Sequence, residues 1–232
     1  MNRRLDCLYR LISPGTGLID VGTDHGYLPV RLALEGYPGR LYASDIREGP
    51  LSAAKRNAAD AGVSERIRFL LSDGLNACPP DEVDTIVIAG MGGDTICGII
   101  DRAEWCMDPR YRLILQPMTK AEILRYWLCH NGFLIDREEL VEDGGTIYQV
   151  VCAVFTGENE RLSDMELWLG KRGLADPALY RRLVEREISR IERQIDGLSS
   201  SSEEDRRRQR AALRLRLQEL NEMEWNRYDD DT

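Results

Sequence analysis

The feature of this sequence that most constrains its fold is the alternation of short apolar runs with helical patterns through the first two thirds of the chain. Such alternation is typical of βαβ units built around a mainly parallel sheet. Glycines at positions 62 and 132 mark the ends of two of the helical patterns. We therefore expect strands at 17–22, 40–45, 67–71, 85–89 and 112–115, and helices at 28–34, 50–61, 94–103 and 120–131.

Two more apolar runs follow, at residues 133–141 and 146–155. They are joined by the turn-rich segment Glu142-Asp143-Gly144-Gly145, which favours an antiparallel pair. The expected α/β sheet therefore has seven strands and ends in a hairpin, unlike the six-stranded sheet typical of dinucleotide-binding domains.

The pattern changes after Thr156-Gly157 to long, charged helices. One apolar stripe has spacings of three and four residues, and a second one follows a polar break at 197–202. We expect a helical, coiled-coil-like hairpin, and hence two domains, 1–156 and 157–232, the second ending in the acidic tail 229–231. The stripes consist of Tyr180, Val184, Ile188, Ile191, Ile195 and Leu198, then Leu213, Leu217 and Leu220.

Composition places the chain among ordinary globular proteins, with 31% charged and 43% hydrophobic residues. The first twelve residues are charged and lack an apolar core, and no run approaches the roughly 20 apolar residues of a membrane span. We expect a cytoplasmic protein that does not bind membranes. The six cysteines show no paired spacing, which predicts free thiols and no metal site.

The net charge of −9 excludes a uniformly basic nucleic-acid binder, since phosphate contacts come from Lys and Arg. Residues 156–232, however, carry 15 basic against 18 acidic residues, and their arginines are clustered. Arg182, Arg186, Arg190 and Arg193 share a helical face that differs from the apolar stripe. This face predicts contacts with RNA; the alternative is local pairing with nearby glutamates.

The strongest local motif lies where the first strand meets the first helix, in the residues Asp20-Val-Gly-Thr-Asp-His-Gly-Tyr27. A glycine-rich turn there lets a ligand approach the backbone and the helix N-terminus. In a dinucleotide site a glycine would face the pyrophosphate, but here Asp24 takes its place. A carboxylate repels a pyrophosphate and attracts the cationic amino and sulfonium groups of S-adenosylmethionine. The motif therefore favours the methyl donor over NAD.

Acidic residues also end the next two strands, at Asp45 and Asp73. Asp45 is placed to accept from ribose hydroxyls, and Asp73 from the exocyclic amine of an adenine. A glycine-rich stretch, 89–93, follows the fourth strand, and Gln116 follows the fifth. The predicted cofactor-binding residues are Asp20, Gly22, Thr23, His25, Gly26, Tyr27, Asp45, Ile46, Asp73, Gly74, Ala89, Gly90, Met91 and Gly92.

Five motifs in order give a resemblance over nearly the whole chain: DVGTDHGYLP at 20–29, SDIREGPLSAAK at 44–55, SDGL at 72–75, IAGMGG at 88–93 and LILQP at 113–117. Together they resemble the bacterial tRNA (adenine-22-N1)-methyltransferase family. The resemblance implies a Rossmann-like class I methyltransferase sheet with a C-terminal helical hairpin, S-adenosyl-L-methionine as cofactor, and methylation of N1 of an adenine in the D-arm of tRNA. Met118 and Gly26 depart from the family pattern.

Adenine N1 keeps a lone pair, so its methylation needs no deprotonation and depends on positioning. A carboxylate that accepts from the exocyclic amine would stabilise the positive charge developing on the ring. Asp24 is the first candidate for this role and Asp94 the second. Gln116 either contacts the base through its amide or caps a loop. Asp24 has two rival roles: binding the amino group of the cofactor, or capping the first helix.

Other readings stay open: a different S-adenosylmethionine-dependent RNA methyltransferase, and a catalytically silent RNA-binding Rossmann module. A methyltransferase acting on a small molecule or a protein is a further alternative, for which the arginine-rich hairpin has no obvious use. The expected partner is tRNA, with the protein as a monomer or weak homodimer.

Overall fold

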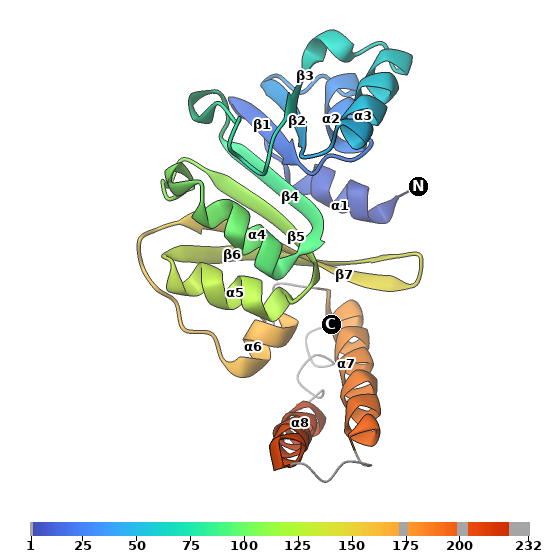
Figure 1. Ribbon diagram of the computed structural model, residues 1–232, viewed down its shortest axis with the longest axis vertical. Coiled ribbons are helices and arrows are strands. Elements are labelled where there is room, and N and C mark those ends of the chain that lie inside the picture. Colours follow the sequence, from blue (N-terminus) through green and yellow to red (C-terminus); the bar gives the residue numbers. More distant parts are fainter. Residues whose placement is uncertain (1, 172–175, 199–203, 223–232) are drawn as a thin grey trace, which may run out of the picture. The chain divides into compact units, whose positions relative to one another are not determined.

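The computed structural model describes residues 2–171, 176–198 and 204–222 and consists of two compact units (Figure 1). The units are Met1–Leu174 and Ala175–Thr232, so the first extends beyond the boundary predicted after residue 156. The reason is that α6 (Asp164–Leu169) packs on α5 (Ala121–His130). Arg125 of α5 donates a 2.9 Å hydrogen bond to the Leu167 carbonyl and thereby ties this segment to the first unit.

The first unit contains a seven-stranded sheet in the order β3-β2-β1-β4-β5-β7-β6. The strands β1 to β5 are parallel, and β7 runs antiparallel to both β5 and β6, which confirms the predicted α/β class and terminal hairpin. The strands are β1 (Gly17–Val21), β2 (Arg40–Asp45), β3 (Ile67–Leu71), β4 (Thr85–Gly92), β5 (Arg112–Thr119), β6 (Phe133–Asp143) and β7 (Thr146–Phe155).

Helices cover both faces of the sheet because buried apolar side chains alternate along each strand (Figure 1). In β1, Leu18 packs in the cluster formed with α1 and α2, whereas Ile19 and Val21 pack in the cluster formed with α4 and α5. The remaining helices of this unit are α1 (Arg3–Leu11), α2 (Tyr27–Leu34), α3 (Glu48–Asp60) and α4 (Gly93–Asp101), with short 3-10 turns η1 (Ser64–Arg66), η2 (Pro80–Glu82) and η3 (Glu104–Cys106).

The helix α1 was not predicted from the sequence. Its N-cap is Asn2, whose side chain accepts a hydrogen bond from the Leu5 amide. Its buried residues, Cys7, Leu8 and Leu11, pack on the same side of the sheet as α2. This placement brings the first residues of the chain to the edge where β4 and β5 end.

The second unit consists of α7 (Pro177–Gly197) and α8 (Glu204–Glu222), which pack on each other as the predicted helical hairpin requires. Asp176 caps α7 by accepting from the Leu179 amide, and Pro177 occupies its first turn. The predicted stripe on α7 is buried or half-buried throughout. The acidic tail lies outside the described residues. No helix in the described ranges is long and apolar enough to span a membrane.

Candidate functional site

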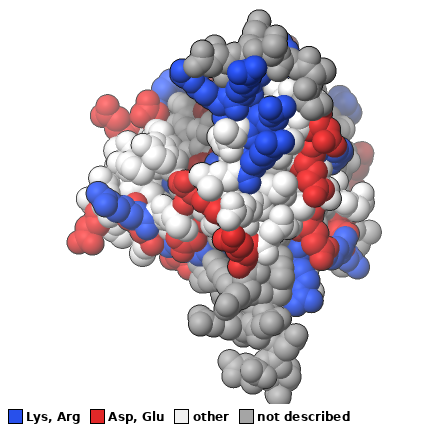
Figure 2. All heavy atoms as spheres, turned by 90° about the horizontal axis from the view of Figure 1, so that it is seen from below, with Lys and Arg blue, Asp and Glu red and all other residues white. Residues whose placement is uncertain are grey.

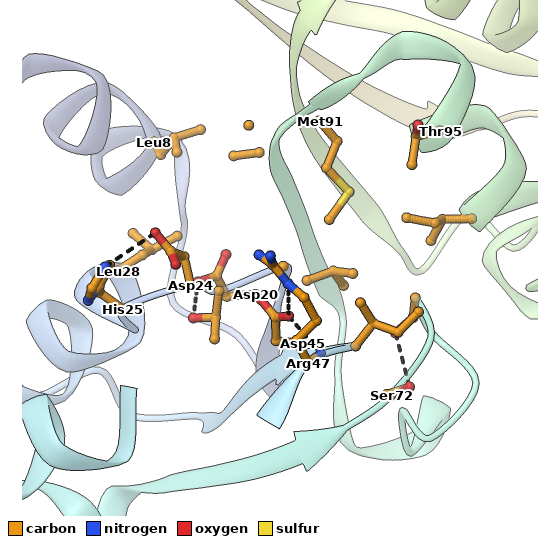
Figure 3. Close-up of a pocket in the computed structure, with 18 of the residues that line it drawn as sticks. Leu8, Asp20, Asp24, His25, Leu28, Asp45, Arg47, Ser72, Met91 and Thr95 are labelled. Carbon is orange, nitrogen blue, oxygen red and sulfur yellow. Dashed lines mark hydrogen bonds and ion pairs between the residues drawn. The ribbon is translucent and has the colours of Figure 1, made fainter. Parts of the chain in front are cut away.

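A pocket of about 690 Å³ opens at the carboxyl ends of the parallel strands (Figure 3). It lies across β1 and β4, which are neighbours in the sheet although the chain passes through β2 and β3 between them. Ligands of open α/β sheets bind at this kind of topological switch point. The predicted site residues that line it are Asp20, Gly22, Thr23, Asp24, His25, Tyr27, Asp45, Ile46, Asp73, Gly74, Ala89, Gly90, Met91 and Asp94.

The turn between β1 and α2 is held in a conformation that few residues adopt. Gly22 has φ +71°, and a Cβ at this position would collide with the methyl group of Met91. Asp24 has φ +52°, a left-handed conformation that Asp tolerates better than most residues. The amides of Gly22 and Thr23 both donate to the Ser44 carbonyl, at 2.8 and 2.9 Å, so the end of β2 fixes this turn.

Asp20, at the end of β1, is buried, with 7% of its surface exposed. Burial raises the pKa of its carboxyl group to about 6, against the opposing effects of the Thr23 hydroxyl and the Arg4 charge. The Thr23 hydroxyl donates to Asp20 Oδ2 at 2.6 Å. Asp20 is therefore mostly ionised at neutral pH, although it is almost inaccessible to solvent.

Asp45 and Asp73 follow at the ends of β2 and β3. Asp45 is buried, and its Oδ1 accepts from the Arg47 amide at 2.9 Å. Among the described residues its second oxygen, Oδ2, has no hydrogen-bond partner. Asp73 is exposed and pairs at 3.3 Å with Arg102, the residue that follows α4. The three acids of consecutive strands thus meet in one pocket, as the sequence predicted.

Asp24 and Asp94, the two candidate catalytic carboxylates, differ in their surroundings. The Asp24 side chain is 66% exposed, and its Oδ2 lies 3.6 Å from His25 Nε2. The His25 ring stacks on Tyr27 with ring centroids 5.4 Å apart. Asp94 accepts from Lys120 Nζ at 2.7 Å, and this hydrogen bond lowers its pKa. The charge of Asp94 is therefore already balanced by Lys120.

Gln116, Gly26 and Gly92 do not line the pocket. Gln116 is fully buried rather than at the rim, and its amide is used within the protein. Its Oε1 accepts from Arg4 Nη1 at 3.0 Å, and its Nε2 donates to the Pro117 carbonyl at 2.9 Å. A direct contact between Gln116 and a base does not fit this environment.

Several residues of the pocket were not predicted. Three of them, Thr95, Gly98 and Ile99, lie on one face of α4, about one helical turn apart. The helix predicted after the fourth strand could have indicated this face. No sequence motif indicated the pocket residues that α1 contributes. The unpredicted residues are Asn2, Arg4, Leu5, Leu8, Val21, Leu28, Arg47, Ser72, Thr95, Gly98, Ile99 and Arg102.

The predicted RNA-contacting arginines of α7 are all exposed, and local contacts are seen within the same helix. Arg190 Nε donates to Glu187 at 2.8 Å, and Arg186 lies 3.9 Å from the same carboxylate. Arg193 Nε donates to the Ser189 carbonyl at 3.1 Å. Basic and acidic side chains both occur on the face shown in Figure 2, and several basic ones are gathered together. Local pairing with Glu187 therefore occurs, while a role in RNA binding stays a prediction.

The fold and the pocket define a Rossmann-like methyltransferase domain of class I. The chain belongs to the family described as "Methyltransferase domain", whose model matches residues 1–151. The motif-based resemblance to the tRNA (adenine(22)-N(1))-methyltransferases is also confirmed.

A Bacillus subtilis tRNA (adenine(22)-N(1))-methyltransferase is 33% identical over 153 residues, which cover 66% of this chain and 64% of that protein. The aligned chain thus spans just under two thirds of this relative. Two solved structures match more completely. A Streptococcus pneumoniae protein in complex with S-adenosyl-L-methionine has 29% identity and a TM-score of 0.82, covering 96% of this chain and 98% of that one. The Bacillus subtilis tRNA adenine-22 methyltransferase has 26% identity and a TM-score of 0.81, covering 96% and 97%.

Proposed function

We propose that this protein transfers a methyl group from S-adenosyl-L-methionine to N1 of adenine 22 in the D-arm of tRNA. The observation that carries the proposal is the row of acids Asp20, Asp45 and Asp73, which line one pocket at the ends of consecutive strands. The similarity to a tRNA methyltransferase of the same specificity and to a structure with the methyl donor bound supports it.

The pocket residues fit this cofactor. Asp45 is a buried carboxylate with an oxygen that has no partner among the described residues, as a ribose hydroxyl would require. Asp73 is placed one strand further along, where it can accept from the exocyclic amine of the cofactor's adenine. Asp20 supplies negative charge toward the cationic end. When bound, the cofactor supplies an electrophilic methyl group.

The acceptor chemistry requires positioning and charge stabilisation from this chain. Asp24 is exposed at the pocket, and its carboxylate lies 3.6 Å from the His25 ring. Its carboxylate can accept from the exocyclic amine of the acceptor adenine and stabilise the charge that develops on that ring. Asp94 is the weaker candidate because its carboxylate is held by Lys120. The His25–Tyr27 pair offers an aromatic surface for a base.

Incubation of the purified protein with labelled S-adenosylmethionine and unmodified tRNA tests the proposal. We expect label in 1-methyladenosine after nucleoside analysis, and none when position 22 of the same tRNA is changed to a base other than adenine. Label in another nucleoside, or label that persists after the change at position 22, would show that the protein methylates a different atom or position of tRNA. Failure to bind the cofactor would remove the enzymatic assignment altogether. The expected cytoplasmic location and the monomeric or weakly dimeric state stay predictions.

A further inference from the structure

Arg4, a residue of α1, contributes a cation to the pocket near the ends of β4 and β5. Its Nη1 donates to Gln116 Oε1 at 3.0 Å and lies 3.9 Å from the Met118 sulfur. The same nitrogen lies 3.6 Å from the position that a Cβ on Gly90 would take. On another side the guanidinium lies 5.5 Å from the centroid of the Tyr148 ring. These contacts fix the guanidinium and leave Nε and Nη2 without a hydrogen-bond partner among the described residues.

The charge of Arg4 differs from that of the other arginines in the pocket. Arg102 pairs with Asp73 at 3.3 Å, and Arg47 lies 3.9 Å from Asp45. Within the described part of the chain, no carboxylate lies at ion-pair distance from Arg4, whose contacts are a neutral amide, a thioether and an aromatic ring. A guanidinium held by neutral partners, with Nε and Nη2 still able to donate hydrogen bonds, is suited to bind an anion from outside the protein.

We propose that Arg4 binds the carboxylate of the methionyl part of S-adenosylmethionine, and that Gln116 positions Arg4 for this contact. This inference rests on the proposed function. The methionyl part carries one carboxylate, which the acids of the pocket would repel. Asp45 and Asp73 assign the nucleoside to the side of β2 and β3, so the other end of the cofactor extends toward β4. Arg4 is the pocket cation at that end.

A tRNA phosphate is the competing anion. Arg4 is half-buried, and its neighbour Gln116 has no exposed surface. The guanidinium is therefore held by a buried hydrogen-bond acceptor, unlike that of a freely moving surface arginine. A fixed guanidinium fork matches a carboxylate bidentately and loses little side-chain entropy on binding. Phosphate contacts by flexible surface arginines need no such support.

Calorimetric binding of two compounds separates these roles. S-adenosylhomocysteine carries the amino group and the carboxylate, whereas its decarboxylated analogue keeps the amino group alone. We expect Arg4→Gln to weaken binding of S-adenosylhomocysteine about tenfold or more and to leave binding of the analogue unchanged. Retained binding of the analogue also shows that the variant folds. Arg3→Gln, an exposed arginine next to it on the same helix, is the matched control and should change neither affinity.

Gln116→Met removes the acceptor that holds Arg4 while it keeps the volume of the side chain. It should weaken binding of S-adenosylhomocysteine selectively, and adding it to Arg4→Gln should cause no further decrease because both changes act on the same interaction. An unchanged affinity of Arg4→Gln for S-adenosylhomocysteine, or equal decreases for both compounds, would overturn the inference. A decrease confined to tRNA affinity would overturn it in favour of a phosphate contact. Wild-type protein that binds neither compound would instead overturn the proposed function.

Discussion

At the scale of single residues, Asp24 differs from the other acids of the pocket in its left-handed backbone conformation. Asp24→Asn should keep the turn, since Asn also tolerates this conformation, while it removes the charge. If Asp24 stabilises charge on the acceptor, kcat should fall by roughly a hundredfold or more with little change in cofactor affinity. Single-turnover methylation and calorimetry on the same variant measure the two quantities.

The matched control is Asp94→Asn. Its carboxylate is balanced by Lys120, so we expect a smaller loss of kcat. A parallel fall of kcat and cofactor affinity in Asp24→Asn would place Asp24 in the cofactor site instead.

Asp20 gives the free protein a pH-dependent stability. Its pKa is about 6 in the folded protein, against an ordinary value of 3.8. Below about pH 4 the group is protonated in both states and has no effect, whereas between about 4 and 6 the folded state binds more protons than the unfolded state. The free energy of unfolding therefore decreases as the pH rises from about 4 to 6. Above about pH 6 the buried charge of Asp20 lowers it by at most about 3 kcal/mol.

Asp20→Asn should remove this cost. Urea unfolding of both proteins at a series of pH values should show the variant gaining stability relative to wild type between about pH 4 and 6, with a constant difference above that range. A difference that does not vary with pH would contradict the assigned pKa.

The acids of the site could be predicted because parallel strands bring their carboxyl ends to one edge, so Asp20, Asp45 and Asp73 had to converge. Arg4 could not be predicted in the same way. Its place in the pocket depends on α1 packing across the sheet, a tertiary contact that leaves no local motif. For the same reason, nothing in the spacing of Gln116 indicated that its amide would be used by Arg4.

At the scale of elements, the buried pair Arg125–Glu138 joins α5, β6 and the segment that contains α6. Arg125 Nε donates to Glu138 at 2.6 Å, its Nη2 donates to Gln149 at 2.6 Å, and the Lys171 amide donates to the other Glu138 oxygen at 2.6 Å. The side chains of Arg125 and Glu138 are 1% and 5% exposed. Removal of one partner would leave an unbalanced charge in the interior.

Arg125→Met should therefore lower the free energy of unfolding by about 3 to 5 kcal/mol, measured by urea denaturation. Changing Glu138→Leu in addition should recover part of this loss, because the uncompensated charge is then gone. The comparison is Arg112→Met, which breaks a pair with Asp136 whose side chains are 30% and 33% exposed, and which should cost less than about 1 kcal/mol. Equal losses in the two single variants would show that burial does not decide the cost.

The strands and their order in the chain followed from apolar runs, but the end of the fourth strand and one short helix did not. The fourth strand was expected to end at residue 89, and β4 continues to Gly92 through register shifts around Gly90, which has φ +83°. Glycine-rich sequence indicated a loop, whereas pairing with β5 kept the segment in the sheet. The helix α6 was missed because it is short, although Ser163 and Glu166 form a capping box at its start.

At the scale of the whole molecule, charge is divided unevenly between the two parts of the chain. Residues 1–155 carry 16 basic and 22 acidic residues, so this part is acidic overall and repels a polyanion at long range. The unit formed by α7 and α8 carries most of the clustered arginines. We therefore expect this unit to supply affinity for tRNA, while the pocket supplies the chemistry.

The test changes Arg182, Arg186 and Arg190 together to Gln, all of them exposed on α7. The buried residues of this helix, including Val184 and Ile191, stay unchanged, so the fold of the unit should be kept. Without these cations, tRNA binding should weaken for every sequence tested, and its salt dependence should become shallower by about one unit for each phosphate that is no longer neutralised. Cofactor affinity should not change, because the pocket residues all belong to the first unit.

The control is the same triple change to Lys, which keeps the charge and should keep most of the affinity and the salt slope. Arg190 already contacts Glu187, so its Gln variant could also act by freeing that glutamate's charge. Adding Glu187→Gln separates the two effects: phosphate contacts predict that tRNA binding stays weak, whereas repulsion by Glu187 predicts recovery. If the Gln triple binds tRNA with wild-type affinity and salt slope, this face does not contact RNA, and the arginines of α7 serve local pairing with glutamates instead.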